Sequence, residues 1–276
     1  MSFSPVVPVG GYGGWTFLKR TMESQTRAFQ AQPELKRDEA YFREKIGAVK
    51  TAEDLVSDRR LLKVALGAYG LDADINNRFF LRKVLEGGTL NDDALANRLA
   101  DKQYRAFSAA FGFGDFAVPS TQLSDFADKV LARHDARQFE IAVGQKSETL
   151  RLALNAEREV PALAGKSSSE DSKWFTIMGT APLRAVFQTA FGLPRSFASI
   201  DIDQQLGVFK AKAEQLFGNA SLSQFSEPEK LDGLLRRYLA LADQGVTGSA
   251  PKGSLALQLL QTRTGSGAAG ILALLG

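Results

Sequence analysis

The sequence Ala, aromatic residue, Gly, large apolar residue occurs three times in this chain of 276 residues. The copies are Ala68-Tyr69-Gly70-Leu71, Ala110-Phe111-Gly112-Phe113 and Ala190-Phe191-Gly192-Leu193. Each copy ends a stretch in which apolar residues recur at helical spacing, and each precedes another such stretch. A glycine can take the left-handed backbone conformation that stops a helix, and the next apolar residue can then fold back on its last turn. The motif therefore predicts a unit of helix, glycine stop and helix that is used repeatedly.

Local signals support helices through most of the chain. Pro33 suits the first turn of a helix, and Thr51 begins a capping-box pattern ahead of a helix expected to run to Gly70. A later helix is expected to break near Pro161, and another to span 202–217. No stretch alternates polar and apolar residues as a strand would. The fold class is therefore predicted to be all-α, a multi-helix globular domain.

Composition divides the chain into three parts. Residues 1–14 are rich in proline and glycine, which predicts a flexible N-terminal arm. Residues 15–245 form the expected globular domain, with a possible internal boundary near 161–172, where a polar, serine-rich stretch lies. Residues 246–276 interleave Gly, Ser, Ala and Thr with two short apolar patches, which predicts a flexible or docking C-terminal tail.

Cysteine is absent and histidine occurs once, at His134. Zinc sites with thiolate ligands, disulfides and thiol nucleophiles are therefore excluded. His134 shares a helical register with Leu123, Ala127 and Val130, and no Gly-x-Ser-x-Gly elbow offers it a nucleophile. We expect a histidine in the core or at its boundary.

The charges are 34 basic and 31 acidic side chains, and the two signs are interspersed. Nucleic-acid binding is not expected, because it usually requires basic residues gathered on one face. The longest apolar runs are far shorter than the roughly 20 residues of a membrane span, so no membrane insertion is expected. The N-terminus lacks a basic region before an apolar stretch. We expect a cytoplasmic protein, or one exported without a cleaved signal peptide.

Two stretches match only part of a known ligand-binding motif. Asp72-Ala-Asp74-Ile-Asn76 matches the start of a calcium-binding loop, but Asn77 replaces the required glycine and Lys83 the bidentate glutamate. Helix capping by the aspartates is the expected role. Gly165-Lys166-Ser167 resembles the end of a phosphate-binding loop without its first glycine or a preceding strand. No metal, cofactor or catalytic residue is predicted.

Carboxylate-only catalysis is the enzyme class that this composition leaves open, because glycan hydrolysis needs only two acids. The candidates are Glu23, Glu39, Glu44, Glu148 and Glu157. A cell-wall hydrolase is therefore one alternative, to be recognised by a glutamate with a raised pKa.

Two stretches resemble a known family. The first runs from Tyr41-Phe42-Arg43-Glu44-Lys45-Ile46 to Ala68-Tyr69-Gly70-Leu71-Asp72, and the second from Trp174-Phe175 through Pro182-Leu183-Arg184 to Ala190-Phe191-Gly192-Leu193-Pro194. They resemble DUF1217, an α-helical family of unknown function from α-proteobacteria, whose genes tend to lie within flagellar gene clusters. The resemblance covers roughly residues 15–245 and supplies no catalytic residues.

This resemblance implies a role in the bacterial flagellum. It suggests a non-enzymatic, flagellum-associated accessory, structural or assembly protein that acts through protein–protein contacts, with flagellar components among its possible partners. The ends lack the long heptad pattern of filament subunits, which favours an accessory role. A carboxylate-based peptidoglycan hydrolase and a cytoplasmic regulatory or nucleic-acid-binding helical module are the alternatives.

Overall fold

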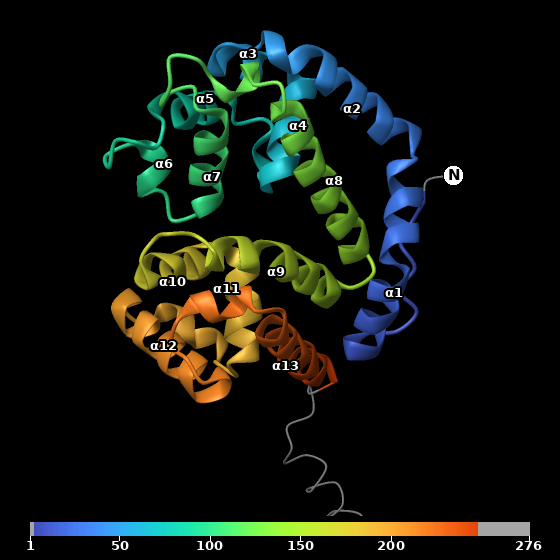
Figure 1. The fold of residues 1–276 in the computed structure, drawn as a ribbon, viewed down its shortest axis with the longest axis vertical. Helices are drawn as coiled ribbons and strands as arrows, with labels where there is room; N and C mark the ends of the chain where they lie inside the picture. Colours follow the sequence, from blue (N-terminus) through green and yellow to red (C-terminus); the bar gives the residue numbers. More distant parts are fainter. Residues whose placement is uncertain (1–2, 248–276) are drawn as a thin grey trace, which may run out of the picture.

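The computed structural model describes residues 3–247, apart from the side chains of residues 195 and 244–247, and within this part of the chain it contains 13 α-helices and no strand (Figure 1). The all-α prediction is confirmed. The helices are α1 (Gly11–Gln30), α2 (Pro33–Lys45), α3 (Ala52–Ser57), α4 (Arg59–Tyr69), α5 (Arg78–Gly87), α6 (Leu95–Arg98), α7 (Lys102–Phe111), α8 (Phe126–Gly144), α9 (Glu148–Ala164), α10 (Glu170–Gly179), α11 (Ala181–Ala190), α12 (Ile202–Phe217) and α13 (Pro228–Thr247). Short 3₁₀ helices cover Ile46–Ala48, Asp72–Asp74, Ser120–Gln122, Arg195–Ser199 and Leu222–Ser226.

The helices pack around two separate hydrophobic cores, which define two lobes. The first lobe contains the end of α2, helices α3 to α7 and the first half of α8. The second contains α1, the second half of α8 and helices α9 to α13. Helix α8 contributes Leu131 to the first core and Phe139 to the second. Figure 1 shows α8 running from one lobe toward the other.

Aromatic rings fill both cores. In the first, Phe111 packs edge-on against Phe107 and Phe126, with centroids 5.0 and 5.1 Å apart. In the second, the fully buried Trp174 packs edge-on against Phe187 and Phe209, at 5.6 and 5.9 Å. Edge-to-face packing is the arrangement that the charge distribution of aromatic rings favours.

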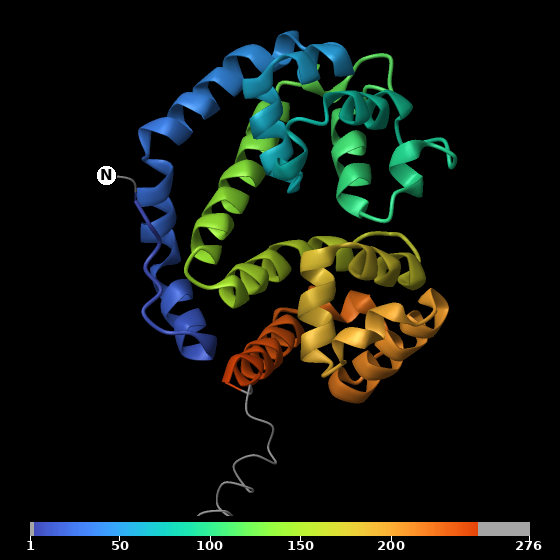
Figure 2. The ribbon, with the colours of Figure 1, turned by 180° about the vertical axis from the view of Figure 1, so that it is seen from behind.

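Helices α1 and α2 form an arc along one side of both lobes, seen from behind in Figure 2. Helix α2 begins at Pro33, as predicted, after the extended residue Gln32. Helix α1 packs on the second core through Trp15 and Leu18, and α2 packs on the first through Phe42. The arc therefore joins the lobes a second time, independently of α8.

The N-terminal segment differs from the expected arm of residues 1–14. Helix α1 begins at Gly11, and the segment before it lies against the helix. The Gln25 side chain accepts a hydrogen bond from Val6 N at 2.7 Å and donates one to Val6 O at 3.2 Å. A contact between residues 19 positions apart is invisible to local composition, which is why proline and glycine content misled the prediction.

The expected boundary near 161–172 does not separate the lobes. Pro161 lies inside α9, and both α9 and α10 belong to the second core. Burial of Val160 and Leu163 on either side of the proline favours continuation of the helix. The cores divide along α8 instead. The expected tail of residues 246–276 lies outside the described residues, except for its first two, which end α13.

The single helix expected between Thr51 and Gly70 is divided into two helices, α3 and α4. The segment from Thr51 to Gly70 divides at Asp58, whose carboxylate accepts hydrogen bonds from the backbone N–H groups of Arg60 and Leu61. Asp58 thus caps α4, while the Thr51 capping box begins α3 as predicted. No helix within residues 3–247 is both long and apolar enough to cross a membrane.

Candidate functional site

The glycines of the repeated motif all have left-handed backbone conformations. Gly70 and Gly112 follow directly on α4 and α7 with φ of 76° and 68°, and Gly192 has φ of 68° two residues after α11. In the first and third copies the next residue bonds back to the helix: Leu71 N donates to Leu66 O at 3.0 Å, and Leu193 N to Gln188 O at 2.9 Å. These bonds satisfy carbonyl groups that a helix end leaves without partners.

The structure brings two copies of the motif together. The ring of Tyr69 lies 6.4 Å from that of Phe111, and both are buried in the first core. Phe191 of the third copy lies in the second core, 5.6 Å from Phe187. The motif residues are therefore core and helix-end residues, and they form no common surface site.

The lone histidine is buried, as expected. His134 is 3% exposed, and its Nδ1 lies 3.3 Å from Oδ1 of Asp135. Within residues 3–247 no group of three or more His, Asp or Glu side chains is arranged to hold a metal ion.

The five candidate glutamates do not form a common site. Four of them make ion pairs, with these partners: Glu23 with Arg27, Glu44 with Lys45, Glu148 with Arg151 and Glu157 with Lys19. Glu39 differs, because partial burial and then the neighbouring Asp135 carboxylate raise its pKa. Its Oε1 is buried and has no hydrogen-bond partner within the described part of the chain. The structure thus singles out one carboxylate pair, Glu39 and Asp135, on α2 and α8.

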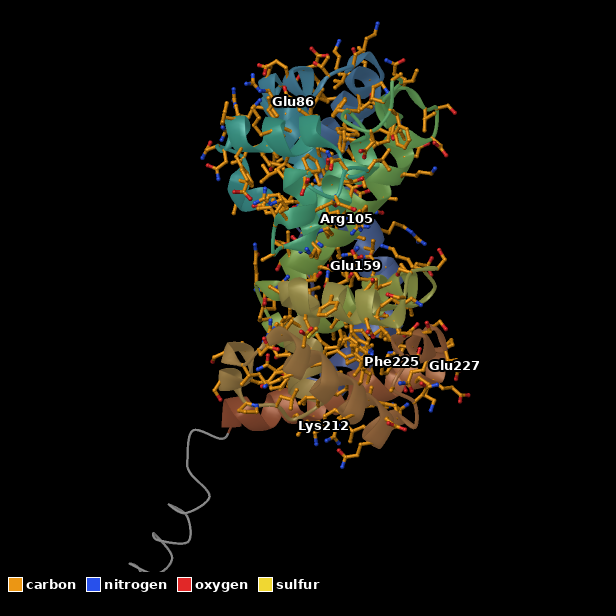
Figure 3. All side chains as sticks on the ribbon, turned by 90° about the vertical axis from the view of Figure 1, so that its left-hand side faces the viewer. Glu86, Arg105, Glu159, Lys212, Phe225 and Glu227 are labelled. Carbon is orange, nitrogen blue, oxygen red and sulfur yellow. The ribbon has the colours of Figure 1, made fainter. Side chains whose placement is uncertain are left out.

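A network of partly buried ion pairs joins α8 to α9 between the lobes. Glu159 accepts hydrogen bonds from Arg133, at 2.6 Å, and from Arg158. Arg158 also binds Glu140 through two nitrogens, at 2.7 and 3.1 Å. Burial alone would raise the pKa of Glu159, but the nearby arginines outweigh burial and lower it. Figure 3 labels Glu159 in the narrow region between the lobes.

A cavity of about 190 Å³ lies beside this network. Its charged and polar lining comes from α7, α8, α9 and the residues around α10: Lys102, Gln103, Arg133, Arg137, Asn155, Glu159, Lys166, Thr176 and Thr180. Arg137 belongs to the same face of α8 as Arg133 and Glu140, yet it takes no part in the ion pairs. It is 8% exposed, and its Nε has no hydrogen-bond partner among residues 3–247.

A second candidate site is an apolar surface on two neighbouring loops of the first lobe. We call Leu90, Phe116 and Val118 the loop patch; their exposed fractions are 72, 58 and 62%. Single exposed apolar residues are ordinary, but several on adjoining loops indicate a contact surface.

Asp115 holds these two loops together. Its carboxylate accepts hydrogen bonds from Thr89 N at 2.6 Å, Thr89 Oγ1 at 2.8 Å and Leu90 N at 3.0 Å. Partial burial raises the pKa of Asp115, but these bonds outweigh burial and the pKa is lowered. The loop patch is therefore presented on a fixed backbone.

Sequence reasoning missed both the loop patch and the cavity. The hydrogen bonds of Asp115 join positions 25 or 26 residues apart, and Arg133 and Glu159 are 26 residues apart. The spacing of Arg133, Arg137 and Glu140 along one helix face was an available signal, because charged residues in register with a buried stripe are rarely left unpaired.

Comparison with known proteins identifies a protein family and a similar crystal structure. No curated protein matches it significantly. The crystal structure of protein AGR_C_984 from Agrobacterium tumefaciens is similar in fold, with a TM-score of 0.72 and 24% sequence identity over 88% of this chain and 99% of that one. The model of a family described as protein of unknown function, DUF1217, matches residues 68–231. The match covers more than half of the sequence, and the chain therefore belongs to the DUF1217 family.

Proposed function

We propose that this protein is a non-enzymatic accessory or assembly protein that works by binding another protein. The loop patch carries this proposal. Leu90, Phe116 and Val118 place apolar surface in water on loops that Asp115 holds in a single arrangement. Burying such side chains in an interface contributes about 25 cal/mol per Å² of apolar area, and a fixed loop loses little conformational entropy on binding.

The partner that we propose is a component of the flagellum. This part of the proposal is supported by the resemblance of residues 41–72 and 174–194 to a family whose genes tend to lie in flagellar gene clusters. The protein would act in the cytoplasm or after export to the flagellum without a cleaved signal peptide.

Complementation of a deletion strain tests this proposal. We expect deletion to impair swimming or the number of flagella, and the wild-type gene to restore both. A variant with Leu90→Ser, Phe116→Ser and Val118→Ser should fold, because these side chains lie outside the core, but should fail to restore motility. Normal swimming and normal flagella in the deletion strain would contradict the flagellar role.

The second lobe offers a matched control. Ile200 and Ile202 are also large, apolar and exposed, at 40 and 46%. A variant with Ile200→Ser and Ile202→Ser removes similar apolar surface elsewhere and should restore motility as the wild type does. Equal failure of both variants would show that the loop patch has no special role.

A second candidate function is carboxylate catalysis on cell wall, favoured by the raised pKa of Glu39 beside Asp135. A raised pKa allows a carboxyl group to act as a general acid near neutral pH. The assay is the loss of turbidity of purified cell wall with wild-type protein and with Glu39→Gln. Clearing that requires Glu39 would establish the hydrolase, whereas no clearing, or equal clearing by the variant, would remove this candidate.

A further inference from the structure

We propose that the cavity between the lobes binds a small phosphate-class anion, with Arg137 as its principal ligand. The anion is either inorganic phosphate or the terminal phosphate of a small molecule. This site is distinct from the loop patch: Lys102 of the cavity begins α7, whereas the loop that carries Phe116 follows the other end of that helix.

The first argument is charge. The cavity lining contains four cationic side chains, Lys102, Arg133, Arg137 and Lys166, and one carboxylate, Glu159. That carboxylate is already shared by Arg133 and by Arg158 behind the lining. Glu140, which is not part of the lining, accepts two hydrogen bonds from Arg158. Four cationic side chains therefore share one carboxylate in the lining, which leaves a surplus of positive charge.

The second argument is the state of Arg137. A guanidinium remains protonated inside a protein, so it cannot avoid the cost of burial by losing its proton. Burial, and then the positive charge of Arg158, lower the pKa of Arg137, and the carboxylates of Glu140 and Glu159 offset this only in part. A buried charge without a partner is strongly unfavourable, and natural proteins pair such groups. An anion in the cavity would supply the missing partner.

The third argument is size and hydrogen bonding. At about 190 Å³ the cavity is smaller than the ~300 Å³ of the smallest pockets for drug-sized ligands, which favours a compact anion. Planar guanidinium groups match the spacing of phosphate oxygens. Asn155 donates to Glu140 through Nδ2, and its buried Oδ1 lacks a partner among residues 3–247. That oxygen can accept the proton of a hydrogen phosphate ion.

The site has an open side at Lys166, which is exposed and follows α9. A phosphate ester could place its phosphate on Arg137 and leave the remainder of the molecule near Lys166. Comparing the binding of inorganic phosphate with that of glycerol phosphate therefore shows whether the ligand is free phosphate or a phosphate ester.

Thermal unfolding and calorimetric titration of the full chain test this proposal. Inorganic phosphate, glycerol phosphate and acetate are added separately at constant ionic strength, so that general screening of charge stays fixed. We expect saturable binding of one or both phosphates and a rise in Tm, since a ligand that binds only the folded state stabilises it. Absence of saturable phosphate binding, or a response to acetate alone, would overturn the proposal.

Phosphate binding by two variants tests whether the anion binds in this cavity. Arg137→Met should reduce phosphate affinity at least tenfold, yet it should unfold at the same temperature as wild type or higher when phosphate is absent, because it removes an unpaired buried charge. Lys166→Gln leaves the interior intact and should weaken binding a few-fold, which keeps the test valid if Arg137→Met misfolds.

The matched control is Arg43→Gln, which removes an arginine whose side chain is 54% exposed and paired with Asp128 on the surface. It should bind phosphate as the wild type does. Undiminished binding by both Arg137→Met and Lys166→Gln would place any phosphate elsewhere and overturn the assignment.

Discussion

The guanidinium of Arg137 occupies the space beside Gly70 into which a side chain at residue 70 would project. A Cβ atom there would lie 2.6 Å from Cζ of Arg137. Gly70 is therefore required twice, by its positive φ and by the close approach of α8 to the end of α4. The first copy of the motif also lines the cavity between the lobes through Tyr69, so that motif and cavity share this part of the molecule.

Substitution of Gly70 should cost more than substitution of Gly192. Both glycines have positive φ, but nothing lies within 4 Å of a Cβ at residue 192. We expect Gly192→Ala to lower the free energy of unfolding by about 1 kcal/mol, from backbone strain alone. Gly70→Ala should lower it by roughly 2–4 kcal/mol, because Arg137 must also move. Urea denaturation of the two variants measures the difference.

A double variant separates strain from steric overlap. If Arg137 causes the additional cost, Gly70→Ala should be less damaging in an Arg137→Ala background than in the wild type. Additive effects of the two substitutions would contradict the contact as the cause.

The stability of the protein should depend on Glu170 at acid pH. Partial burial raises the pKa of this residue, but hydrogen bonds from Ser223 and Lys173 outweigh burial and lower it to about 2. A pKa lowered in the folded state contributes stability that is complete above the unfolded value, about 4.5, and is lost as the pH falls toward 2. Glu170→Gln should therefore flatten the decline of the unfolding free energy between about pH 5 and about pH 2.

Urea titrations at a series of pH values provide the measurement for Glu170. Glu227, an exposed glutamate labelled in Figure 3, serves as the control. The slope of Glu227→Gln should match that of the wild type, and an unchanged slope in Glu170→Gln would contradict the role of the Ser223 and Lys173 contacts.

Loss of Asp115 should loosen the loops without removing any apolar side chain. Asp115→Ala leaves the N–H groups of Thr89 and Leu90 without their acceptor. We expect limited proteolysis to cleave residues 88–91 and 113–118 several-fold faster, because cleavage follows local opening. Asp125→Ala is the control, since Asp125 pairs with Lys129 on the surface of α8. Equal cleavage of the two variants would show that Asp115 does not fix the loops.

The sequence predicted features that depend on neighbouring residues. Helix α12 spans Ile202–Phe217 as expected, Pro33 begins α2, and Thr51 caps α3. Asp58 carries an equally local capping signal, but the apolar spacing on both sides concealed it. Such signals are readable because a cap bonds residues two or three positions away.

The remaining features arise from packing between distant segments. Pro161 lies inside a helix because its neighbours are buried, and Gln25 orders the N-terminal segment by bonding Val6. The position of Arg137 depends on how α4, α8 and α9 approach one another, which no local pattern contains. Periodicity therefore predicted the helices, whereas the cavity and the loop patch required the tertiary arrangement.

The most direct test of the proposed function is photo-crosslinking in motile cells. A photoreactive amino acid replaces Phe116 in the loop patch, and in a parallel strain it replaces the exposed Ile202 of the second lobe. We predict that position 116 crosslinks to one defined flagellar protein and that position 202 does not. No adduct at position 116, or the same adducts at both positions, would contradict binding of a protein partner through these loops.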